Sequence, residues 1–438
     1  MSQTVQQPDV ASKTIGVVGL GYVGLPLAVA FDDAGLGVVG FDVSREKVDA
    51  LDAGEDPIEE VGDDTVAASD ADFTADPSTL VDCDLVVLTV PTPVDDVGTP
   101  DFSYIESAGE TVGEHMAPGT TVVLESTVYP GATEDVLVPA LEAASGLELG
   151  DDFGVGYSPE RVSPGDSKRG LRDVTKIVSG HSEDAREEIA AVYEAVVDAG
   201  IHRVDEIKTA EAAKAIENVQ RDINIALVNE LAIACDHLDV DAEAVLEAAG
   251  TKWNFHDEYR PGLVGGHCIP VDPHLFSYES ERQGFEPDLI VQAREINEYM
   301  PAHVAEKARK AMNDARTVPA ETDLLVMGVA YKPNVGDIRT SKVKPIVEDL
   351  AEYGVSMTVH DPYAADDEIR DEFGVDVVSD PDLEAYDGVL FGVGHDEFHS
   401  IEAADLVSAL NGSGFVVDVP GVVDEDAAHT ADLTYRKL

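Results

Sequence analysis

One cysteine lies in a loop whose composition suits covalent chemistry. Residues 261–273 read PGLVGGHCIPVDP, with three glycines and three prolines. Such a segment neither continues a helix nor fits a central strand, so it predicts a tight loop whose backbone approaches a ligand closely. Cys268 lies near its centre, four residues before Asp272. A thiol in this place can act as a nucleophile. The alternative is a small buried apolar residue, which most free cysteines are.

The N-terminal part carries a turn typical of dinucleotide binding. A buried-strand pattern at 14–18 runs directly into GLGYVG at 19–24, and a helical pattern follows. The next strand pattern ends in Asp42, eighteen residues after the last glycine. The glycines bring a pyrophosphate close to the helix N-terminus, and the carboxylate accepts hydrogen bonds from the ribose. This spacing predicts NAD as the cofactor, while Arg45 and Lys47 leave its 2′-phosphorylated relative open.

Three further strand patterns end in polar clusters. The pattern at 84–90 ends in PTP, the one at 120–124 is followed by EST, and the one at 153–157 is followed by SPER. Ligands of parallel α/β sheets lie beyond the carboxyl ends of the strands. We therefore expect Thr127 and Glu160 to face the nicotinamide and the substrate. For Thr127, capping of the next helix is an equally open alternative.

A long helix without Gly or Pro is predicted over residues 208–238. It is apolar on most sides, but a line of polar residues spaced three and four apart runs along it. This line comprises Glu211, Lys214, Asn218 and Arg221. Charges embedded in an apolar helix are costly unless they are paired or used, so the line favours a site over a solvated stripe. A second helical stretch is predicted over 287–313, with a break at Pro301.

Strand–helix alternation resumes in the C-terminal part, from a strand at 323–330 onward, without a second glycine-rich turn. This part is therefore expected to bind something other than a second dinucleotide. Lys332 and Arg339 are scarce cations near the end of that strand and suit the phosphates of a substrate. Two solvated surface cations are the alternative. The predicted fold class is α/β, with two Rossmann-like doubly wound domains joined by a central helical segment. The expected domains are 1–205, 206–315 and 316–438.

Acidic residues far outnumber basic ones. The 438-residue chain has 88 Asp and Glu against 28 Lys and Arg, a net charge of −60. Acids spread along helix faces resemble the surfaces of proteins from salt-accumulating halophiles, and the lack of a basic face argues against nucleic acid as a partner. The three cysteines are far apart and odd in number, which fits a reducing cytoplasm. No apolar run is long enough to span a bilayer. We expect a cytoplasmic protein without a membrane partner or a metal.

Seven ordered motifs together resemble the UDP-glucose/GDP-mannose dehydrogenase family, from Lys13 to about Asp418. These motifs are residues 19–24, 91–93, 125–127, 158–161, 211–229, 261–273 and 331–341. The resemblance implies an N-terminal NAD domain, a helical middle that forms a dimer interface, and a C-terminal domain that grips the nucleotide. A homodimer or higher homo-oligomer is therefore expected, with a UDP-sugar as substrate.

The resemblance also implies two successive NAD-dependent oxidations at C6 of a nucleotide sugar, from alcohol to carboxylate. Cys268 would trap the intermediate aldehyde as a thiohemiacetal, which is then oxidised to a thioester and hydrolysed. Lys214 and Asn218 would stabilise oxyanions, and Asp272 would hold a water or Lys214. Glu160 and Thr127 would position the water that accepts a proton.

By motif position, two further groups of residues carry over from the family. The cofactor group comprises Gly19, Gly21, Tyr22, Val23, Gly24, Asp42, Arg45, Pro91, Thr92 and Thr127. The substrate group comprises Glu160, Arg161, Lys214, Asn218, Arg221, Gly265, Gly266, His267, Tyr331, Lys332 and Arg339.

The cysteine loop bears on the choice of sugar. UDP-glucose enzymes of the family usually show a GGSCFPKD type of loop, whereas residues 265–273 read GGHCIPVDP. This form resembles the dehydrogenases of UDP-N-acetylhexosamines, with UDP-N-acetyl-mannosamine as the first expectation and surface polysaccharide synthesis as the purpose. UDP-glucose 6-dehydrogenase is the alternative. Residues 260–263, RPGL, depart from the PGPG that is common in relatives.

We expect the protein to lose stability when salt is diluted. Charges repel over about 10 Å at 0.1 M salt but over only about 3 Å at 1 M, so dilution exposes the acidic surface to its own repulsion. The midpoint of thermal unfolding, followed by circular dichroism, should fall steadily as KCl is diluted from about 2 M to about 0.1 M. A midpoint that does not move would contradict the halophilic interpretation.

Overall fold

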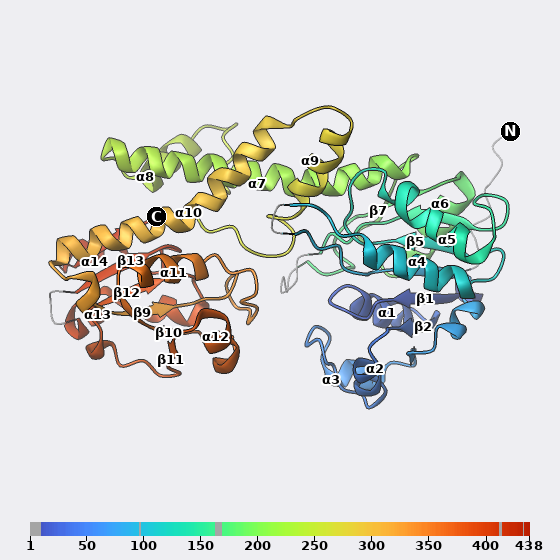
Figure 1. Ribbon diagram of the computed structural model, residues 1–438, viewed down its shortest axis with the longest axis horizontal. Helices are drawn as coiled ribbons and strands as arrows, with labels where there is room; N and C mark the ends of the chain where they lie inside the picture. The colour runs from blue at the N-terminus through green and yellow to red at the C-terminus, as the bar shows by residue number, and fades with distance from the viewer. Residues whose placement is uncertain (1–9, 96–97, 163–168, 411–413, 432) are drawn as a thin grey trace. The chain divides into compact units, whose positions relative to one another are not determined.

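The structure is a computed structural model, which describes residues 10–95, 98–162, 169–410, 414–431 and 433–438. The chain forms two compact units (Figure 1). The first comprises Met1–Glu217 and His274–Glu286, and the second comprises Asn218–Pro273 and Pro287–Leu438. The chain passes from one unit to the other within α7 (Ile207–Leu238), within α9 (Asp272–Arg282) and between Glu286 and Pro287.

The first unit is built on a sheet that, within the described residues, has eight strands in the order β3-β2-β1-β4-β5-β6-β7-β8. All neighbouring strands are parallel except β6 and β7. The first six strands follow the order of a doubly wound dinucleotide fold, which reverses direction between β1 and β4. The strands are β1 (Thr14–Val18), β2 (Gly37–Phe41), β3 (Asp72–Thr74), β4 (Leu85–Leu88), β5 (Thr121–Leu124), β6 (Gly154–Tyr157), β7 (Lys176–Gly180) and β8 (Ile201–Arg203).

Both faces of this sheet are buried. In β4, Leu85 and Val87 pack in a core with α1 and α6, whereas Val86 and Leu88 pack in a core with α4 and α5. Successive side chains of a strand point to opposite faces, so a strand covered on both sides reads as an unbroken apolar run. The helices are α1 (Gly24–Asp33), α2 (Arg45–Asp52), α3 (Asp63–Ala68), α4 (Ser103–His115), α5 (Val138–Ser145) and α6 (Glu183–Glu194).

The second unit repeats the same strand order. Its sheet, as far as the structure describes it, is β11-β10-β9-β12-β13-β14 with all pairs parallel. Its strands are β9 (Asp323–Met327), β10 (Ser356–His360), β11 (Asp376–Val377), β12 (Gly388–Phe391), β13 (Phe415–Asp418) and β14 (Thr434–Lys437). Its helices are α8 (Ala242–Gly250), α10 (Asp288–Ala315), α11 (Lys344–Glu352), α12 (Asp366–Phe373), α13 (Ala403–Ala409) and α14 (Glu425–Thr430).

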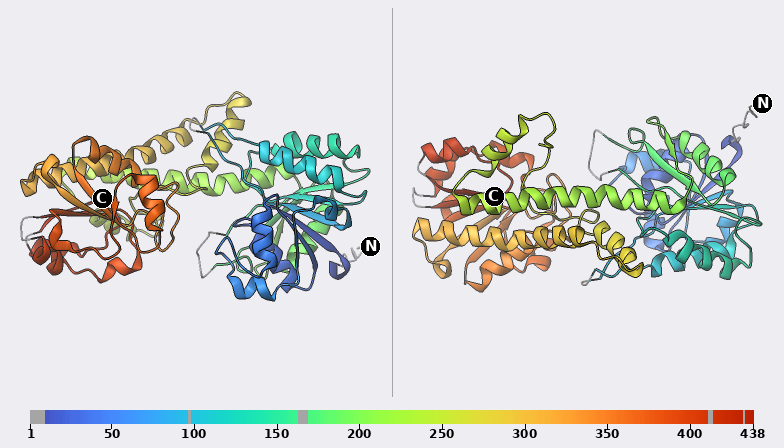
Figure 2. Two further views of the ribbon diagram at one scale, coloured as in Figure 1. Left: turned by 60° about the horizontal axis from the view of Figure 1, so that its bottom comes forward. Right: turned by 90° about the horizontal axis from the view of Figure 1, so that it is seen from above.

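Helix α10 is continuous through Pro301, so the break expected there is wrong (Figure 2). Proline removes one backbone donor and crowds the preceding turn. The helix nevertheless continues because it is held on both sides of the proline. Before it, Arg294 and Asn297 bond to α7, and after it, Val304 and Ala308 lie in the core of the second unit.

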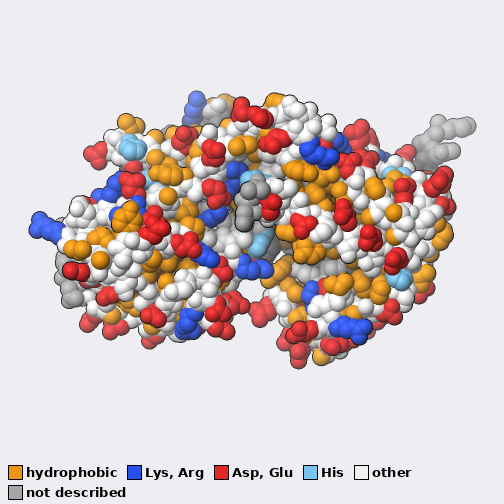
Figure 3. Space-filling view, viewed as in Figure 1, with side chains coloured by type: hydrophobic (Ala, Val, Ile, Leu, Met, Phe, Trp, Pro, Cys, Tyr) orange, Lys and Arg blue, Asp and Glu red, His pale blue; other side chains and the backbone are white. Residues whose placement is uncertain are grey.

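The predicted fold class is confirmed, with two doubly wound α/β units and a long helix between them in the sequence. The expected boundaries after residues 205 and 315 stay a prediction. Among the residues that the structure describes, none of the helices combines the length and the apolar character needed to cross a bilayer. On the face shown in Figure 3, acidic side chains are spread widely and basic ones are few.

Candidate active site

The glycine-rich turn between β1 and α1 leaves room for a pyrophosphate. Gly19 has φ +95°, and a Cβ on Gly24 would lie 1.9 Å from the Gly19 carbonyl oxygen, so neither position accepts a side chain. A Cβ on Gly21 would meet nothing within 4 Å. Val23 precedes α1 and provides no side-chain cap, and Tyr22 is exposed. No side chain caps the start of α1, and the Leu25 N–H donates to the Gly21 carbonyl oxygen at 3.1 Å, so the turn leads directly into the helix with its glycines open to a dinucleotide.

Asp42, at the end of β2, ties the glycine turn to the second strand. Its carboxylate is 6% exposed and accepts hydrogen bonds from the Leu20 N–H at 2.8 Å and the Ser44 N–H at 2.9 Å. Lys47 Nζ lies 2.6 Å from the same carboxylate, while Arg45 is exposed in the first turn of α2. A ribose hydroxyl would share this carboxylate with Lys47.

The loops after β4 and β5 are bonded to each other. The Thr92 hydroxyl donates to the Thr127 carbonyl oxygen at 2.6 Å, and the Ser126 hydroxyl donates to the Val90 carbonyl oxygen at 2.5 Å. Pro91 lies exposed between them in the chain. The helical turns that follow, over residues 133–145, have no side-chain cap, so capping does not explain Thr127. Thr127 is half-buried at the carboxyl edge of the sheet, as expected.

A buried ion pair behind Glu160 was not found from the sequence. Lys176, which begins β7, pairs with Glu125 at the end of β5, and both side chains are almost fully buried. The Tyr193 hydroxyl also donates to Glu125, and Lys176 Nζ lies 4.9 Å from the Tyr193 ring centre. Burial raises the pKa of Glu125 to about 7 although Lys176 opposes the shift. A lysine at the start of a buried strand, in a chain poor in lysine, is the signal that was available.

Glu160 is held at the edge of this pair. Its carboxylate lies 3.7 Å from Lys176 Nζ and accepts hydrogen bonds from the N–H groups of Arg161 and Val162. The Arg161 guanidinium lies 2.7 Å from Glu217, so Arg161 is engaged within the unit. Glu160 therefore has a fixed position and a neighbouring cation, which suits a carboxylate that orients a water molecule.

In the first unit, α7 is anchored by Glu211. This carboxylate is completely buried and accepts hydrogen bonds from the N–H groups of Gly131 and Thr133 and from the Thr133 hydroxyl. Burial raises its pKa despite these donors. Glu211 thus joins α7 to the segment that follows the Thr127 loop, one turn of helix before Lys214, which is also buried.

The line of polar residues predicted on α7 agrees only in part with the polar residues that are buried in the structure. Asn218 is half-buried, and its Nδ2 donates to Asp272 Oδ2 at 2.5 Å. Arg221 is exposed, whereas its neighbour Asp222 is buried and bonds to Arg294 at 2.5 Å. At 100° per residue, the residues that share one face are Glu211, Asn218, Asp222 and Asn229. The successive spacings between these residues, seven, four and seven, were the pattern in the sequence that would have predicted this face.

The cysteine loop presents Cys268 at the surface of the second unit. Cys268 is exposed, whereas Cys83 and Cys235 are buried, so the small apolar role fits the latter two and not Cys268. The Cys268 carbonyl oxygen accepts from the N–H groups of Val271 and Asp272, at 3.1 and 2.9 Å, and so begins the turn that leads into α9. Cys268 therefore lies in an ordered turn that leads into α9.

The two glycines before His267 pack against the loop after β9. A Cβ on Gly265 would lie 2.7 Å from the Thr340 carbonyl oxygen, and one on Gly266, with φ +91°, would lie 3.0 Å from the Tyr331 ring. The Gly266 N–H also donates to the Thr340 hydroxyl at 3.0 Å. Only glycine fits this close approach.

His267 and Arg339 converge on one carboxylate in the second unit. His267 Nε2 lies 3.1 Å from Asp337, and the Arg339 guanidinium contacts both oxygens of Asp337, at 3.0 and 2.7 Å. Burial acts to raise the pKa of Asp337, but these hydrogen bonds hold it well below its usual range. Lys332 Nζ lies 5.3 Å from the Tyr331 ring centre. The cations expected to bind phosphate thus lie in the loop after β9, which packs against the cysteine loop.

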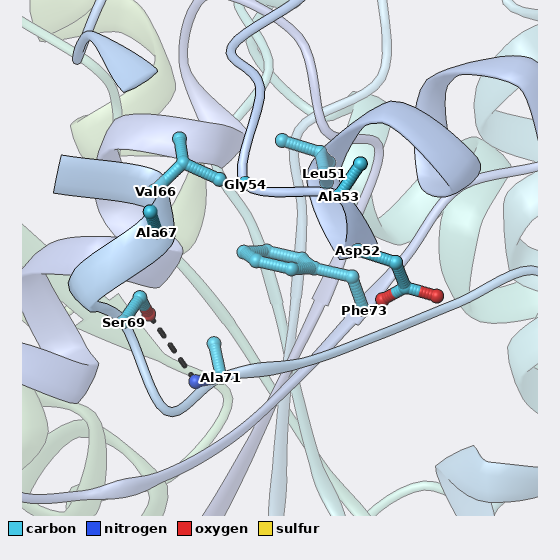
Figure 4. Close-up of a pocket in the computed structure, with 9 residues that line it drawn as sticks. All are labelled: Leu51, Asp52, Ala53, Gly54, Val66, Ala67, Ser69, Ala71 and Phe73. Carbon is cyan, nitrogen blue, oxygen red and sulfur yellow. Dashed lines mark hydrogen bonds between the residues drawn. The ribbon is translucent and has the colours of Figure 1, made fainter. Parts of the chain in front are cut away.

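A separate cavity of about 230 Å³ lies by the short helix α3 (Figure 4). It is lined by Leu51, Asp52, Ala53, Gly54, Val66, Ala67, Ser69, Ala71 and Phe73. None of the residues predicted for the cofactor or substrate belongs to this lining.

Comparisons with known proteins give the family. Models of the UDP-glucose/GDP-mannose dehydrogenase family match three parts of the chain: the NAD binding domain over residues 13–197, the central domain over 208–299 and the UDP binding domain over 325–425. The chain belongs to this family. It is an NAD-dependent nucleotide-sugar dehydrogenase, as the resemblance predicted.

Relatives match along almost the whole chain. Protein CapL of Staphylococcus aureus is 42% identical over 97% of this chain and all of its own length. UDP-N-acetyl-D-glucosamine 6-dehydrogenase of Pseudomonas aeruginosa is 42% identical over 94% of this chain and 97% of its own. The solved structure of UDP-D-ManNAc dehydrogenase from Pyrococcus horikoshii has a TM-score of 0.86 and 31% identity, with 97% and 98% of the two chains covered.

Removal of Lys176 should destabilise the fold, because its buried partner Glu125 would lose its cation. We expect Lys176→Met to lower the free energy of unfolding by about 3–5 kcal/mol, because Glu125 stays buried without its cation. The loss should be larger at about pH 9 than at about pH 6, since a carboxyl whose folded pKa is raised destabilises the fold as it ionises. Urea unfolding in high salt measures both values. The double variant Lys176→Met/Glu125→Gln should recover most of the loss, and an equal loss in the double variant would contradict the pairing.

Proposed function

We propose that this protein oxidises C6 of a UDP-N-acetylhexosamine from alcohol to carboxylate, with Cys268 as the covalent nucleophile. The observation that carries the proposal is an exposed thiol in a loop held by Asn218 and by the loop after β9, in a chain of this family. A two-electron dehydrogenase has no use for such a thiol. NAD, when bound in the first unit, accepts a hydride in each of the two oxidations.

In the first oxidation the C6 hydroxyl loses its proton while C6 loses a hydride. Thr127 and Glu160 are proposed to hold the water that accepts this proton, because both lie at the carboxyl edge of the sheet and Glu160 is fixed by backbone donors. Lys214 and Asn218 are proposed to stabilise the developing oxyanion. Fixed donors of this kind are most effective where water is excluded.

In the second oxidation the Cys268 thiolate adds to the aldehyde carbon and forms a thiohemiacetal. Loss of a second hydride gives a thioester, and water then attacks the thioester carbonyl, which releases the carboxylate and returns the thiol. Asp272 is proposed to position the groups around this carbonyl, since it is buried and is bonded to Asn218 at the first residue of α9.

UDP-N-acetyl-D-glucosamine is proposed as the first substrate to test. Two relatives named UDP-N-acetyl-D-glucosamine 6-dehydrogenases are 42% identical to this chain, whereas those named UDP-N-acetyl-D-mannosamine dehydrogenases are 31–34% identical. This difference favours the glucosamine epimer over the mannosamine epimer that the loop led us to expect. UDP-glucose remains the alternative substrate, and a role in polysaccharide synthesis stays a prediction.

A UDP-sugar panel in high-salt buffer tests the proposal. We expect two NADH per sugar and a carboxylate product by mass spectrometry, with the N-acetylhexosamines oxidised faster than UDP-glucose. Cys268→Ser should stop at the aldehyde with one NADH per sugar, and Cys235→Ser is the matched control because that cysteine is buried. Two NADH from Cys268→Ser would overturn the covalent route, and a faster rate on UDP-glucose would favour the alternative.

The protein is further proposed to form a homodimer through α7. In the second unit, α7 exposes the apolar residues Leu227, Leu231 and Leu238 along one side, with Leu227 54% and Leu238 71% exposed. This side is opposite to the one that holds Asn218, Asp222 and Asn229. Large exposed leucines in a row are unusual on so acidic a surface and fit a second copy of the chain.

Substitution of this leucine row should separate the dimer. Leu227→Arg/Leu231→Arg is expected to halve the mass measured by light scattering, because charged side chains are not buried without partners. Val43→Arg, at a site 83% exposed in the first unit, is the control and should leave the mass unchanged. An unchanged mass for the double variant would rule out this side of α7 as the interface.

A further inference from the structure

We propose that Asn229 is a positioning residue for Cys268, and that it acts by holding the backbone of Gly262 at the start of the cysteine loop. The proposal rests on the proposed function, because only the second oxidation uses the thiol. Asn229 lies on α7, is completely buried, and bonds to Gly262 and Asn297, neither of which is assigned to the chemistry.

The Asn229 carboxamide binds Gly262 as a neighbouring strand would. Its Oδ1 accepts from the Gly262 N–H at 2.8 Å, and its Nδ2 donates to the Gly262 carbonyl oxygen at 3.1 Å. A carboxylate would lack the donor, and an aliphatic side chain would lack both groups. The carboxamide thus satisfies both the N–H and the carbonyl oxygen of Gly262. A backbone group that loses its hydrogen-bond partner away from water lowers the free energy of unfolding.

The orientation of the carboxamide is set from α10. Asn229 Nδ2 also donates to Asn297 Oδ1 at 2.8 Å, and Asn297 Nδ2 donates to Asp222 Oδ1 at 2.8 Å. Arg294 bonds to the same Asp222 oxygen at 2.5 Å. The Asp222 carboxylate can only accept hydrogen bonds, so Asn297 must point its Nδ2 at Asp222 and its Oδ1 at Asn229. Asn229 must in turn point its Nδ2 at Asn297. Asn229 is therefore held with its oxygen towards the Gly262 N–H.

The same helix holds the other end of the loop. Asn218, eleven residues earlier on α7, donates to Asp272 at the first residue of α9. At about 1.5 Å per residue, Asn218 and Asn229, which hold the two ends of the loop, are about 16 Å apart along the helix. Cys268 lies in the segment between Gly262 and Asp272, so α7 sets the span within which the thiol is placed. Small displacements of a reacting group cost large factors in rate.

The test separates the two oxidations in single turnover with UDP-N-acetylglucosamine, excess NAD and a hydrazine probe for free aldehyde. For Asn229→Ala we expect the first NADH at a rate within about twofold of the unsubstituted protein, the second slowed about tenfold or more, and free aldehyde to accumulate. Asn224→Ala is the matched control on the same helix, since among the described residues its side chain bonds to the Gln220 carbonyl oxygen of α7 alone. It should leave both rates unchanged.

Equal slowing of both oxidations, or of neither, would overturn the inference, because a loss of fold would affect both steps alike. If Asn229→Ala does not fold in high salt, Asn297→Ala removes the group that orients the carboxamide, and the same split between the two steps is expected. Cys268→Ser is run in parallel. Two NADH from that variant would refute the proposed function, whereas one NADH together with two normal rates for Asn229→Ala would refute only the role of Asn229.

Discussion

The buried polar face of α7 is the constraint on which the candidate chemistry depends. Four side chains on this face bond to four different parts of the chain: the segment after the Thr127 loop, the first residue of α9, helix α10 and the start of the cysteine loop. Buried polar groups of this kind are costly unless every one is satisfied, and satisfied networks specify a single arrangement. Within the second unit, Asn218, Asp222 and Asn229 on this helix therefore hold three segments that are far apart in the sequence.

Glycines and a proline show how packing decides what the backbone accepts. Gly265 and Gly266 can lie close to the loop after β9 because they have no Cβ to collide with it, and Gly24 approaches Gly19 for the same reason. Pro301 shows the reverse case, in which packing overrides a local preference: a residue that usually ends a helix lies within one. Bonds on one side and core packing on the other outweigh its lost hydrogen bond.

Much of the site was readable from local patterns. The glycine turn, Asp42 and the PTP and EST clusters were placed correctly at the carboxyl edge of the first sheet, because strand order and turn chemistry are written locally. Lys176 and Glu125 were not, since they are fifty-one residues apart and meet only when β5, β6 and β7 are assembled. Arg221 was chosen over Asp222 because spacing alone does not tell which side of an apolar helix is covered.

By itself, the sequence determined the family, the cofactor, the α/β fold class and the candidate nucleophile. These follow from residue types at short spacing, where glycine conformations and apolar periodicity leave few choices. Tertiary structure alone decided which of three cysteines is exposed, which face of α7 is buried, and that Asn229 rather than a loop residue holds Gly262. Contacts over long sequence separation depend on how the sheets and helices pack, and no local pattern encodes that.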